Sequence, residues 1–401
     1  MATYQDIIYY ENFSDSHQRQ GLQGIFRQNR GTGITIAILS TGIINHPLVN
    51  DKVIGGKNFT TDNGGVATNY SEPLTESSRN LFVRGTMFAS IIASGVRYNP
   101  DGTEKHKHEG VLSGLGIAPD VNLLIGKVKT NDGIGTLQQT IDGINWAKDW
   151  IGPNEEKVDI ILLDHYTTVN EPTYEAAINA AANAGKIIVA STANTETNTA
   201  TTVYPAMYSN VISFISVDRS TDDLSVGDYP FRAKTNPNIV ADLAVQGGWP
   251  FIYYASNVMF YGGSDTNVNG AVGAGFLALL LQAYKEAKNP LTSKDKIMTE
   301  ITKYVRAFVP SSNATLLASK GMLQINRNLL PNEMSATSQI IIETKYVNKY
   351  VPVEVPVTIV KKIREIVVPI SAMNNGGNNS PTDKRQQILD RINKLNSMQK
   401  K

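Results

Sequence analysis

The stretch Tyr261-Gly262-Gly263-Ser264-Asp265-Thr266-Asn267 precedes eleven consecutive residues without a polar side chain, 271–281. A helix that is apolar on every side cannot lie on a protein surface, so it must cross the interior of a large core. Eleven residues are too few to span a bilayer. The start of such a helix carries unpaired N–H groups and a partial positive charge. The sequence therefore predicts that Ser264 and Asp265 are held at an electropositive point suited to a nucleophile or an anion. The alternative is that Asp265 only caps the helix.

Composition narrows the class of protein. The chain has 401 residues, of which 41% are hydrophobic, enough for one large domain or two ordinary ones. A net charge of +1 argues against broad nucleic-acid binding and against a membrane-surface role. Cysteine is absent, which excludes disulfides and thiolate metal sites, and five histidines are few for a metal centre. We expect no metal and no cofactor.

The N-terminal residues show no basic region followed by an apolar run, so we expect no secretory signal. The corresponding expectation for location is the cytoplasm or the interior of a protein particle.

Short apolar runs typical of strands alternate with helical patterns through the first two thirds of the chain. This alternation predicts an α/β fold with a parallel sheet covered by helices on both faces. Ligands of such sheets bind at the carboxyl ends of the strands, where Ser40, Asp164 and 191–194 stand. The predicted strands are 34–39, 121–128, 158–163, 187–190 and 211–217, and the predicted helices are 82–93, 136–150 and 174–184.

The C-terminal part has a different character. Residues 340–370 alternate like a strand, but Pro352 and Pro356 forbid a central one, so we expect an extended arm. An amphipathic helix at 383–399 is marginal alone and needs a partner for its apolar stripe. We therefore expect the arm and the helix to contact other protein subunits in a homo- or hetero-oligomer, unless the helix folds back on its own domain. The expected division is an N-terminal segment 1–20, a main domain 21–330, an arm and linker 331–381, and a helix 382–401.

Eight sequence blocks between residues 21 and 328 resemble, in the same order, those of the subtilisin-like serine proteases, the subtilase family. They are 36–43 with 46–48, 84–90, 114–119 with 127–128, 132–135, 191–194, 204–206 with 211–212, 263–266, and 321–326. The resemblance implies a subtilisin-like three-layer α/β fold, with a mostly parallel sheet and a buried central helix. The arm and the short C-terminal helix would be additions to it.

The resemblance breaks at the catalytic positions. Where the family has its orienting Asp, general-base His and nucleophilic Ser, this chain has Ser40, Arg84 and Asp265. The family's oxyanion Asn is retained as Asn194. Arginine stays protonated near neutral pH and cannot act as the base, and an aspartate nucleophile would have no base beside it. The sequence therefore predicts no catalytic residue and no enzyme activity, with Arg84 and Asp265 joined as an ion pair.

The resemblance also implies a substrate cleft, in which bulky Tyr166 would narrow one pocket. The expected cleft residues are Asp132, Gly133, Gly135, Asp164, His165 and Tyr166.

Three functions are compatible with these observations. The first, which the sequence favours, is an inactive structural or assembly subunit of a larger complex, for which a virion or similar particle is one setting. The second is a peptide-binding protein that keeps the cleft without the chemistry. The third is a hydrolase with a rearranged active site that uses Asp265, His165 or Ser40.

Overall fold

The computed structural model describes residues 29–72, 84–95, 116–192, 203–217, 241–246, 250–252, 259–261, 268–306 and 319–323. All of them belong to the first of the two units into which the chain divides, Met1–Glu333 and Met334–Lys401. The arm 340–370, the helix 383–399 and the segment 1–20 lie outside the described residues. Asp265 and Asn194 also lie outside them.

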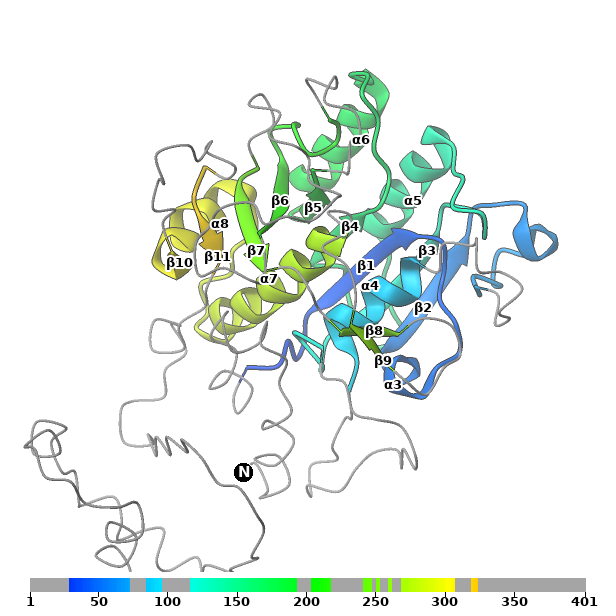
Figure 1. The fold of residues 1–401 in the computed structure, drawn as a ribbon, viewed down its shortest axis with the longest axis horizontal. Coiled ribbons are helices and arrows are strands. Elements are labelled where there is room, and N and C mark those ends of the chain that lie inside the picture. Colours follow the sequence, from blue (N-terminus) through cyan, green and yellow to red (C-terminus); the bar gives the residue numbers. More distant parts are fainter. Residues whose placement is uncertain are drawn as a thin grey trace, which may run out of the picture. The chain divides into compact units, whose positions relative to one another are not determined.

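A twisted sheet forms the centre of the described part (Figure 1). Its nine described strands pair in parallel, except for the antiparallel pair β10–β11 at one end. A separate antiparallel pair joins β8 (Pro250–Ile252) and β9 (Met259–Tyr261). The order across the large sheet is β10 (Val305–Arg306), β11 (Met322–Leu323), β7 (Leu243–Gln246), β6 (Val211–Val217), β5 (Ile187–Ser191), β4 (Ile160–Leu163), β1 (Thr35–Ser40), β3 (Asn122–Lys127) and β2 (Val53–Asn58).

Strand β1 lies inside this sheet, between β3 and β4. All six of its residues are buried, as expected of a parallel strand covered on both faces. The register pairs Ser40 with Lys127 of β3, and Leu39 with Leu163 of β4. The carboxyl ends of these three strands therefore meet at one edge of the sheet.

Helices cover both faces of the sheet, as the alternating sequence pattern predicts. Successive residues of β1 point to opposite faces, so Ile36 and Ile38 enter one apolar core while Ala37 and Leu39 enter the other. The first core contains α4 (Arg84–Ala93) and α7 (Asn269–Glu286), and the second contains α5 (Leu137–Asp149) and α6 (Pro172–Asn183). The smaller described elements are α3 (Pro47–Asn50), η3 (Asp62–Gly65), α8 (Lys294–Ile301) and η6 (Thr302–Tyr304).

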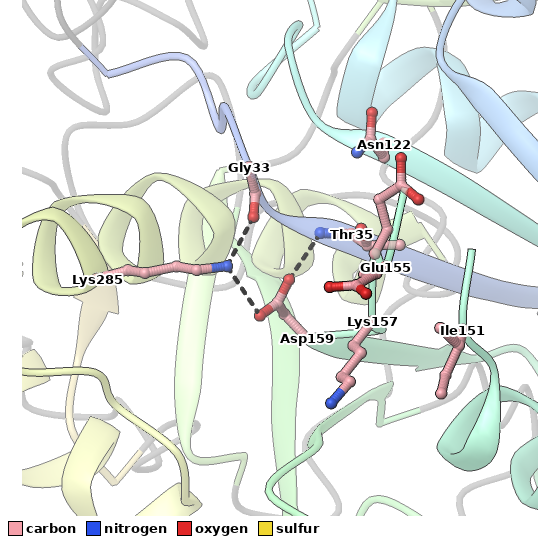
Figure 2. Close-up of a pocket in the computed structure, with 9 residues that line it drawn as sticks. Gly33, Thr35, Asn122, Ile151, Glu155, Lys157, Asp159 and Lys285 are labelled. Carbon is pink, nitrogen blue, oxygen red and sulfur yellow. Dashed lines mark hydrogen bonds and ion pairs between the residues drawn. The ribbon is translucent and has the colours of Figure 1, made fainter. Parts of the chain in front are cut away.

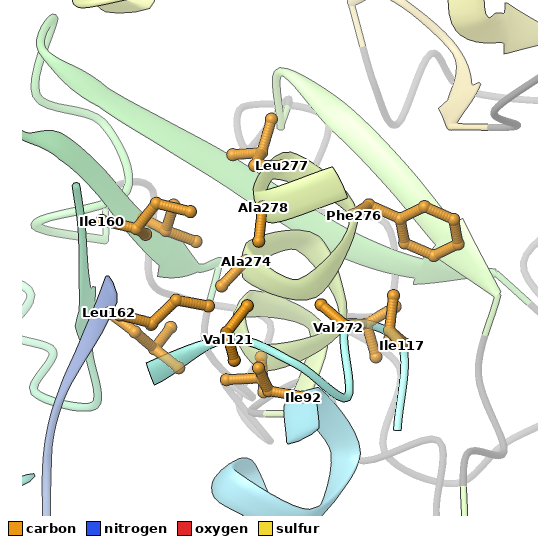
Figure 3. Packing of buried hydrophobic residues seen from close by; sticks show 14 of the residues in the cluster. Ile92, Ile117, Val121, Ile160, Leu162, Val272, Ala274, Phe276, Leu277 and Ala278 are labelled. Carbon is orange, nitrogen blue, oxygen red and sulfur yellow. The ribbon is translucent and has the colours of Figure 1, made fainter. Parts of the chain in front are cut away.

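Helix α7 is the buried central helix that the apolar run predicts. Every residue from Asn269 to Tyr284 is buried. Figure 3 shows this helix among side chains from β4, from α4 and from the segment before β3. Gly273 is needed here because a Cβ at this position would lie 2.3 Å from the ring of Phe214. Truncating a large apolar side chain in such a core, for example Leu277→Ala, costs about 2–5 kcal/mol.

Helix α5 begins at the residue that the sequence suggests. The Thr136 hydroxyl accepts a hydrogen bond from the Gln139 N–H at 3.2 Å, and the Gln139 side chain accepts one from the Thr136 N–H at 2.8 Å. This reciprocal cap satisfies two of the N–H groups that a helix start leaves unpaired. Among the helices that the structure describes, none is long and apolar enough to cross a membrane.

Candidate active site

The carboxyl edge of the sheet brings Ser40 and Asp164 together. Ser40 ends β1 and Asp164 directly follows β4, and the Asp164 N–H donates to the carbonyl of Leu39 at 3.2 Å. This parallel pairing places the two side chains side by side. The Ser40 hydroxyl donates a hydrogen bond to Oδ2 of Asp164 at 2.7 Å, and both residues are buried.

Two cations converge on the same carboxylate. Arg84, the first residue of α4, donates to Oδ1 of Asp164 at 3.0 Å. The ammonium of Lys129, two residues beyond β3, lies 3.3 Å from Oδ2 and also donates to the backbone carbonyl of Asp164. The carboxylate is therefore oriented from two sides while it accepts the hydrogen bond of Ser40.

The charges around Asp164 determine its ionisation. Burial by itself would raise the pKa of Asp164, but the charges of Lys129 and Arg84 and the hydrogen bonds from Ser40 and Lys129 outweigh it. The pKa of Asp164 is consequently below its usual value, and the group is ionised at neutral pH. Burial lowers the pKa of Lys129, with Asp164 opposing and Arg84 assisting this shift.

His165 follows Asp164 and lies beside α6. Burial, together with the charge of Lys129, lowers the pKa of His165 to about 4, although Asp164 acts in the opposite direction. Its ring packs edge-on against Tyr174, with 5.9 Å between ring centroids. At neutral pH His165 is therefore an uncharged imidazole next to the Asp164 cluster.

The other expected cleft residues lie on two loops at this edge. Asp132, Gly133 and Gly135 occupy the turn between β3 and α5, where Gly133 donates to the Thr130 carbonyl at 2.8 Å. Tyr166 lies on the segment after β4 and is 45% exposed. The contact between Lys129 and Asp164 ties the first loop to the second.

Lys129 is the site residue that the sequence reasoning missed. It lies 35 positions before Asp164 and 45 after Arg84, and no local pattern relates the three. The available signal was its place just past a buried strand at the carboxyl edge, the same criterion that singled out Ser40 and Asp164. The predicted ion pair between Arg84 and Asp265 stays a prediction, because Asp265 is outside the described residues.

A pocket of about 630 Å³ lies at the opposite edge of the sheet (Figure 2). Thr35 begins β1, so the five residue steps to Ser40 put about 16 Å between the pocket and the site. Asp159 accepts a hydrogen bond from the Thr35 N–H at 2.8 Å and pairs with Lys285 at 3.8 Å, while Lys285 donates to the Gly33 carbonyl. The charges of Asp159 and Lys285 in this pocket are therefore paired with each other. Its lining comprises Gly33, Thr35, Asn122, Ile151, Glu155, Glu156, Lys157, Asp159 and Lys285.

The residues around Asp164 have the arrangement of a nucleophilic site. A hydroxyl within hydrogen-bonding reach of a base, with the base itself oriented by further groups, is the arrangement of an activated nucleophile. Within the described part of the chain, no group of three or more His, Asp or Glu side chains is placed to hold a metal ion.

Comparison with known proteins identifies the family that this fold and site geometry indicate. The model of the Peptidase_S8 subtilase family matches residues 31–322. The chain belongs to the subtilase family. The match covers nearly all of the described sheet together with α4, α5, α6 and α7, so the subtilisin-like α/β fold expected from the sequence is confirmed.

The relatives of this chain include proteins that are named as serine proteases. The chain is 27% identical to the major intracellular serine protease of Bacillus subtilis (strain 168) over 317 residues, which cover 77% of this subtilase and 86% of that protein. It is 30% identical over 260 residues to thermitase of Thermoactinomyces vulgaris, covering 65% of this chain and 78% of thermitase. A solved structure of a protease from Pseudoalteromonas arctica PAMC 21717 shares the fold. Its TM-score is 0.58 at 19% identity, with 78% of this chain and 95% of that chain covered.

Relatives named as serine proteases overturn the expectation of an inactive structural or assembly subunit without enzyme activity, because their similarity extends over most of this subtilase's length. That expectation assumed that activity requires the family's usual residue types at the positions of Ser40, Arg84 and Asp265. In the structure, Ser40 instead has a carboxylate acceptor, and two cations orient that carboxylate.

Proposed function

We propose that this subtilase hydrolyses peptide bonds through a rearranged centre, in which Ser40 is the nucleophile and Asp164 accepts its proton. The observation that carries the proposal is the 2.7 Å hydrogen bond from the Ser40 hydroxyl to Asp164. Arg84 and Lys129 orient the carboxylate, and the protease names of the relatives support the reaction class.

The proposed reaction forms and breaks bonds in two stages. Oγ of Ser40 attacks the carbonyl carbon of the peptide while its proton passes to Asp164 Oδ2. The C–N bond then breaks, the proton leaves with the amine, and the acyl group remains on Ser40 as an ester. Water hydrolyses the ester and returns the proton to Ser40. Arg84 supplies fixed positive charge close to the developing oxyanion, the kind of stabilisation that dominates such reactions.

The ionisation of Lys129 gives this reaction a pH dependence. A carboxylate whose pKa is held low is a weak base, so the rate at neutral pH is modest. The pKa of Lys129 is lowered by burial, and loss of its proton at alkaline pH removes one of the charges that weaken Asp164 as a base. The rate is therefore expected to rise as the pH approaches the pKa of Lys129.

The departure from the family's usual triad is part of the proposal. From the resemblance of the sequence blocks, we place Ser40 and Arg84 at the positions of the orienting Asp and the base, and Asp265 at that of the nucleophile. Because Ser40 is fully buried, its hydroxyl must become accessible before a substrate can react with it. Slow labelling of Ser40 by small reagents is an expected consequence.

The test is cleavage of casein and of a fluorogenic peptide library by the full chain. We expect cleavage by the wild type and a loss of about 10²-fold or more in Ser40→Ala. Ser213→Ala is the matched control, because Ser213 is also buried and donates to an aspartate, Asp242, that pairs with Lys294. An inactive wild type, or equal activity in Ser40→Ala and the wild type, contradicts the proposal.

The interaction of 340–370 and 383–399 with other subunits remains a sequence-based proposal. The mass in solution of the full chain and of a variant ending at residue 330 tests it. An oligomer that becomes a monomer on truncation supports the proposal, and a full chain that is already monomeric contradicts it.

A further inference from the structure

A second buried carboxylate lies near the site, outside the reaction described above. Glu72 is 3% exposed and accepts four hydrogen bonds from three residues. Oε1 accepts from the Thr41 hydroxyl and from the Gly85 N–H at 3.1 Å. Oε2 accepts from the hydroxyl of Thr86 and from its N–H at 3.3 Å.

Two of these donors immediately follow residues that contact Asp164. Thr41 comes directly after Ser40, and Gly85 comes directly after Arg84. The Thr41 hydroxyl also accepts a hydrogen bond from the Gly85 N–H at 3.0 Å, so the end of β1 and the start of α4 share one network around Glu72.

The backbones of the two segments touch at the same place. A Cβ added to Gly85 would lie 1.8 Å from the carbonyl oxygen of Gly42, a distance that no side chain tolerates. Gly42 itself has φ +115° and lies against the Tyr70 carbonyl. The approach of α4 to β1 is thus set by backbone contact and by the hydrogen bonds of Glu72.

Lys127 holds the β1 side of this network. Its ammonium donates to the Thr41 carbonyl and to Oδ1 of Asn131 at 2.7 Å, and it pairs with Asp62 at 3.3 Å. The segment that carries Ser40 is therefore anchored independently of Asp164.

We infer that Glu72 is a positioning residue, which fixes the spacing between Ser40 and Arg84 so that both reach Asp164 at once. The inference rests on the proposed function of Ser40 and Asp164. Glu72 contacts none of the reacting groups and acts only through Thr41, Gly85 and Thr86. A misplacement of about 1 Å at a reacting group can cost about 10²-fold in rate, so the spacing matters even though Glu72 is remote from the substrate.

The test variant is Glu72→Gln, which keeps the shape of the side chain. Its NH₂ group must face one of the two pairs of donors, so at least one backbone N–H loses its hydrogen bond to the side chain of residue 72. Asp242→Asn is the matched control, because Asp242 likewise accepts from a backbone N–H and a hydroxyl, those of Ser213, away from the site. Thr41→Val is a milder second variant, which removes one hydroxyl and leaves Glu72 in place.

Kinetics give the first readout. We expect folded Glu72→Gln to lower kcat about tenfold or more with KM within about twofold, and Asp242→Asn to change neither. Thr41→Val should fall between Glu72→Gln and the wild type. An unchanged kcat in folded Glu72→Gln, or in Thr41→Val if Glu72→Gln does not fold, overturns the inference.

Crystal structures of the same variants give a second readout that needs no activity. We expect Glu72→Gln to lengthen the Ser40–Asp164 or the Arg84–Asp164 contact beyond a hydrogen-bonding reach of about 3.2 Å, and Asp242→Asn to preserve both. An inactive wild type contradicts the proposed function alone. The positioning role of Glu72 is then decided by these distances, and it is wrong if both contacts are preserved.

Discussion

Asp164 and Glu72 are two buried carboxylates beside the same two segments, the end of β1 and the start of α4, and their pKa values shift in opposite directions. Each accepts a hydroxyl from the end of β1, and each contacts the start of α4. The pKa of Asp164 is nevertheless lowered, whereas the pKa of Glu72 is raised. Burial raises the pKa of both groups, so the difference comes from the groups that contact each carboxylate.

The partners of Asp164 are two cations within 3.3 Å, and they outweigh the effect of its burial. The partners of Glu72 are hydroxyl and N–H groups, with Lys127 acting only through its charge, and burial prevails. One carboxylate is therefore an ionised acceptor suited to chemistry, and the other is a structural link. At nearly equal burial, charged partners rather than the number of hydrogen bonds decide the direction of the pKa shift.

The largest expected effect is the loss of stability in Asp164→Ala. This change leaves Arg84 and Lys129 without their shared carboxylate in a buried site, which costs about 3–5 kcal/mol. Unfolding in urea measures the cost. Asp120→Ala, which breaks the more exposed pair with Arg30, is the control and should cost less than about 1 kcal/mol. Equal costs for the two variants would contradict the larger cost expected for breaking the buried pairs of Asp164.

His165 should make the Asp164 region sensitive to acid. Its pKa is about 4 in the folded protein and 6.5 in the unfolded chain, so the unfolded state binds the additional proton between these values. Stability is therefore fully present above pH 6.5 and is lost as the pH falls toward 4, by at most about 3 kcal/mol. Urea unfolding of the wild type and of His165→Gln at pH 7 and pH 4 measures this loss. A loss of the same size in His165→Gln would assign it to other groups.

Glu72→Gln should cost about 1–3 kcal/mol, since one buried N–H loses its hydrogen bond to the side chain of residue 72. The accompanying pH dependence has the opposite sign to that of Asp164. Because the pKa of Glu72 is raised, its contribution is present below 4.5 and is lost as the pH rises through the folded value. The contribution of Asp164 is present above 3.8 and is lost as the pH falls through its lowered value. The free energies of unfolding of Glu72→Gln and Asp164→Asn are measured between pH 3 and pH 8 and subtracted from that of the wild type. The two differences should change with pH in opposite directions. Parallel slopes would contradict the comparison.

The smallest effect on stability is expected for Tyr166→Ala. This side chain is 45% exposed, so the free energy of unfolding should change by less than about 0.5 kcal/mol. If Tyr166 narrows a substrate pocket, as the sequence suggests, KM for peptides with large side chains should fall. Stopped assays measure KM for one peptide with a small side chain and for one with a large side chain. An unchanged ratio of the two KM values would exclude Tyr166 from the pocket.

The sequence predicted five neighbouring strands of the nine described in the main sheet, because buried parallel strands are continuous apolar runs; β7, β10 and β11 were not predicted. The strand at 211–217 was predicted with the bounds that the structure has, and β1 is shifted by one residue from 34–39. Strand β2 (Val53–Asn58) was not predicted, since Gly55 and Gly56 interrupt its apolar pattern. Pairing in the sheet, rather than local propensity, makes it a strand.

The site was predicted only in part. Ser40, Arg84 and Asp164 were singled out, yet their common contact was not, because hydrogen bonds between residues 80 to 124 positions apart leave no local signal. Glu72 was overlooked for the same reason, since Ser71-Glu72-Pro73 reads as an ordinary loop. The residue types at positions 40, 84 and 265 indicated a loss of activity. The arrangement around Asp164 depends in addition on Lys129, which is not one of these three residues.

The most direct measurement is the site at which a fluorophosphonate probe modifies the full chain, found by intact mass and peptide mapping. The proposed function predicts one adduct on Ser40, formed faster at alkaline pH, absent in Ser40→Ala and preserved in Ser213→Ala. No adduct after prolonged incubation, or an adduct on Ser264 with Ser40 unmodified, would contradict Ser40 as the nucleophile.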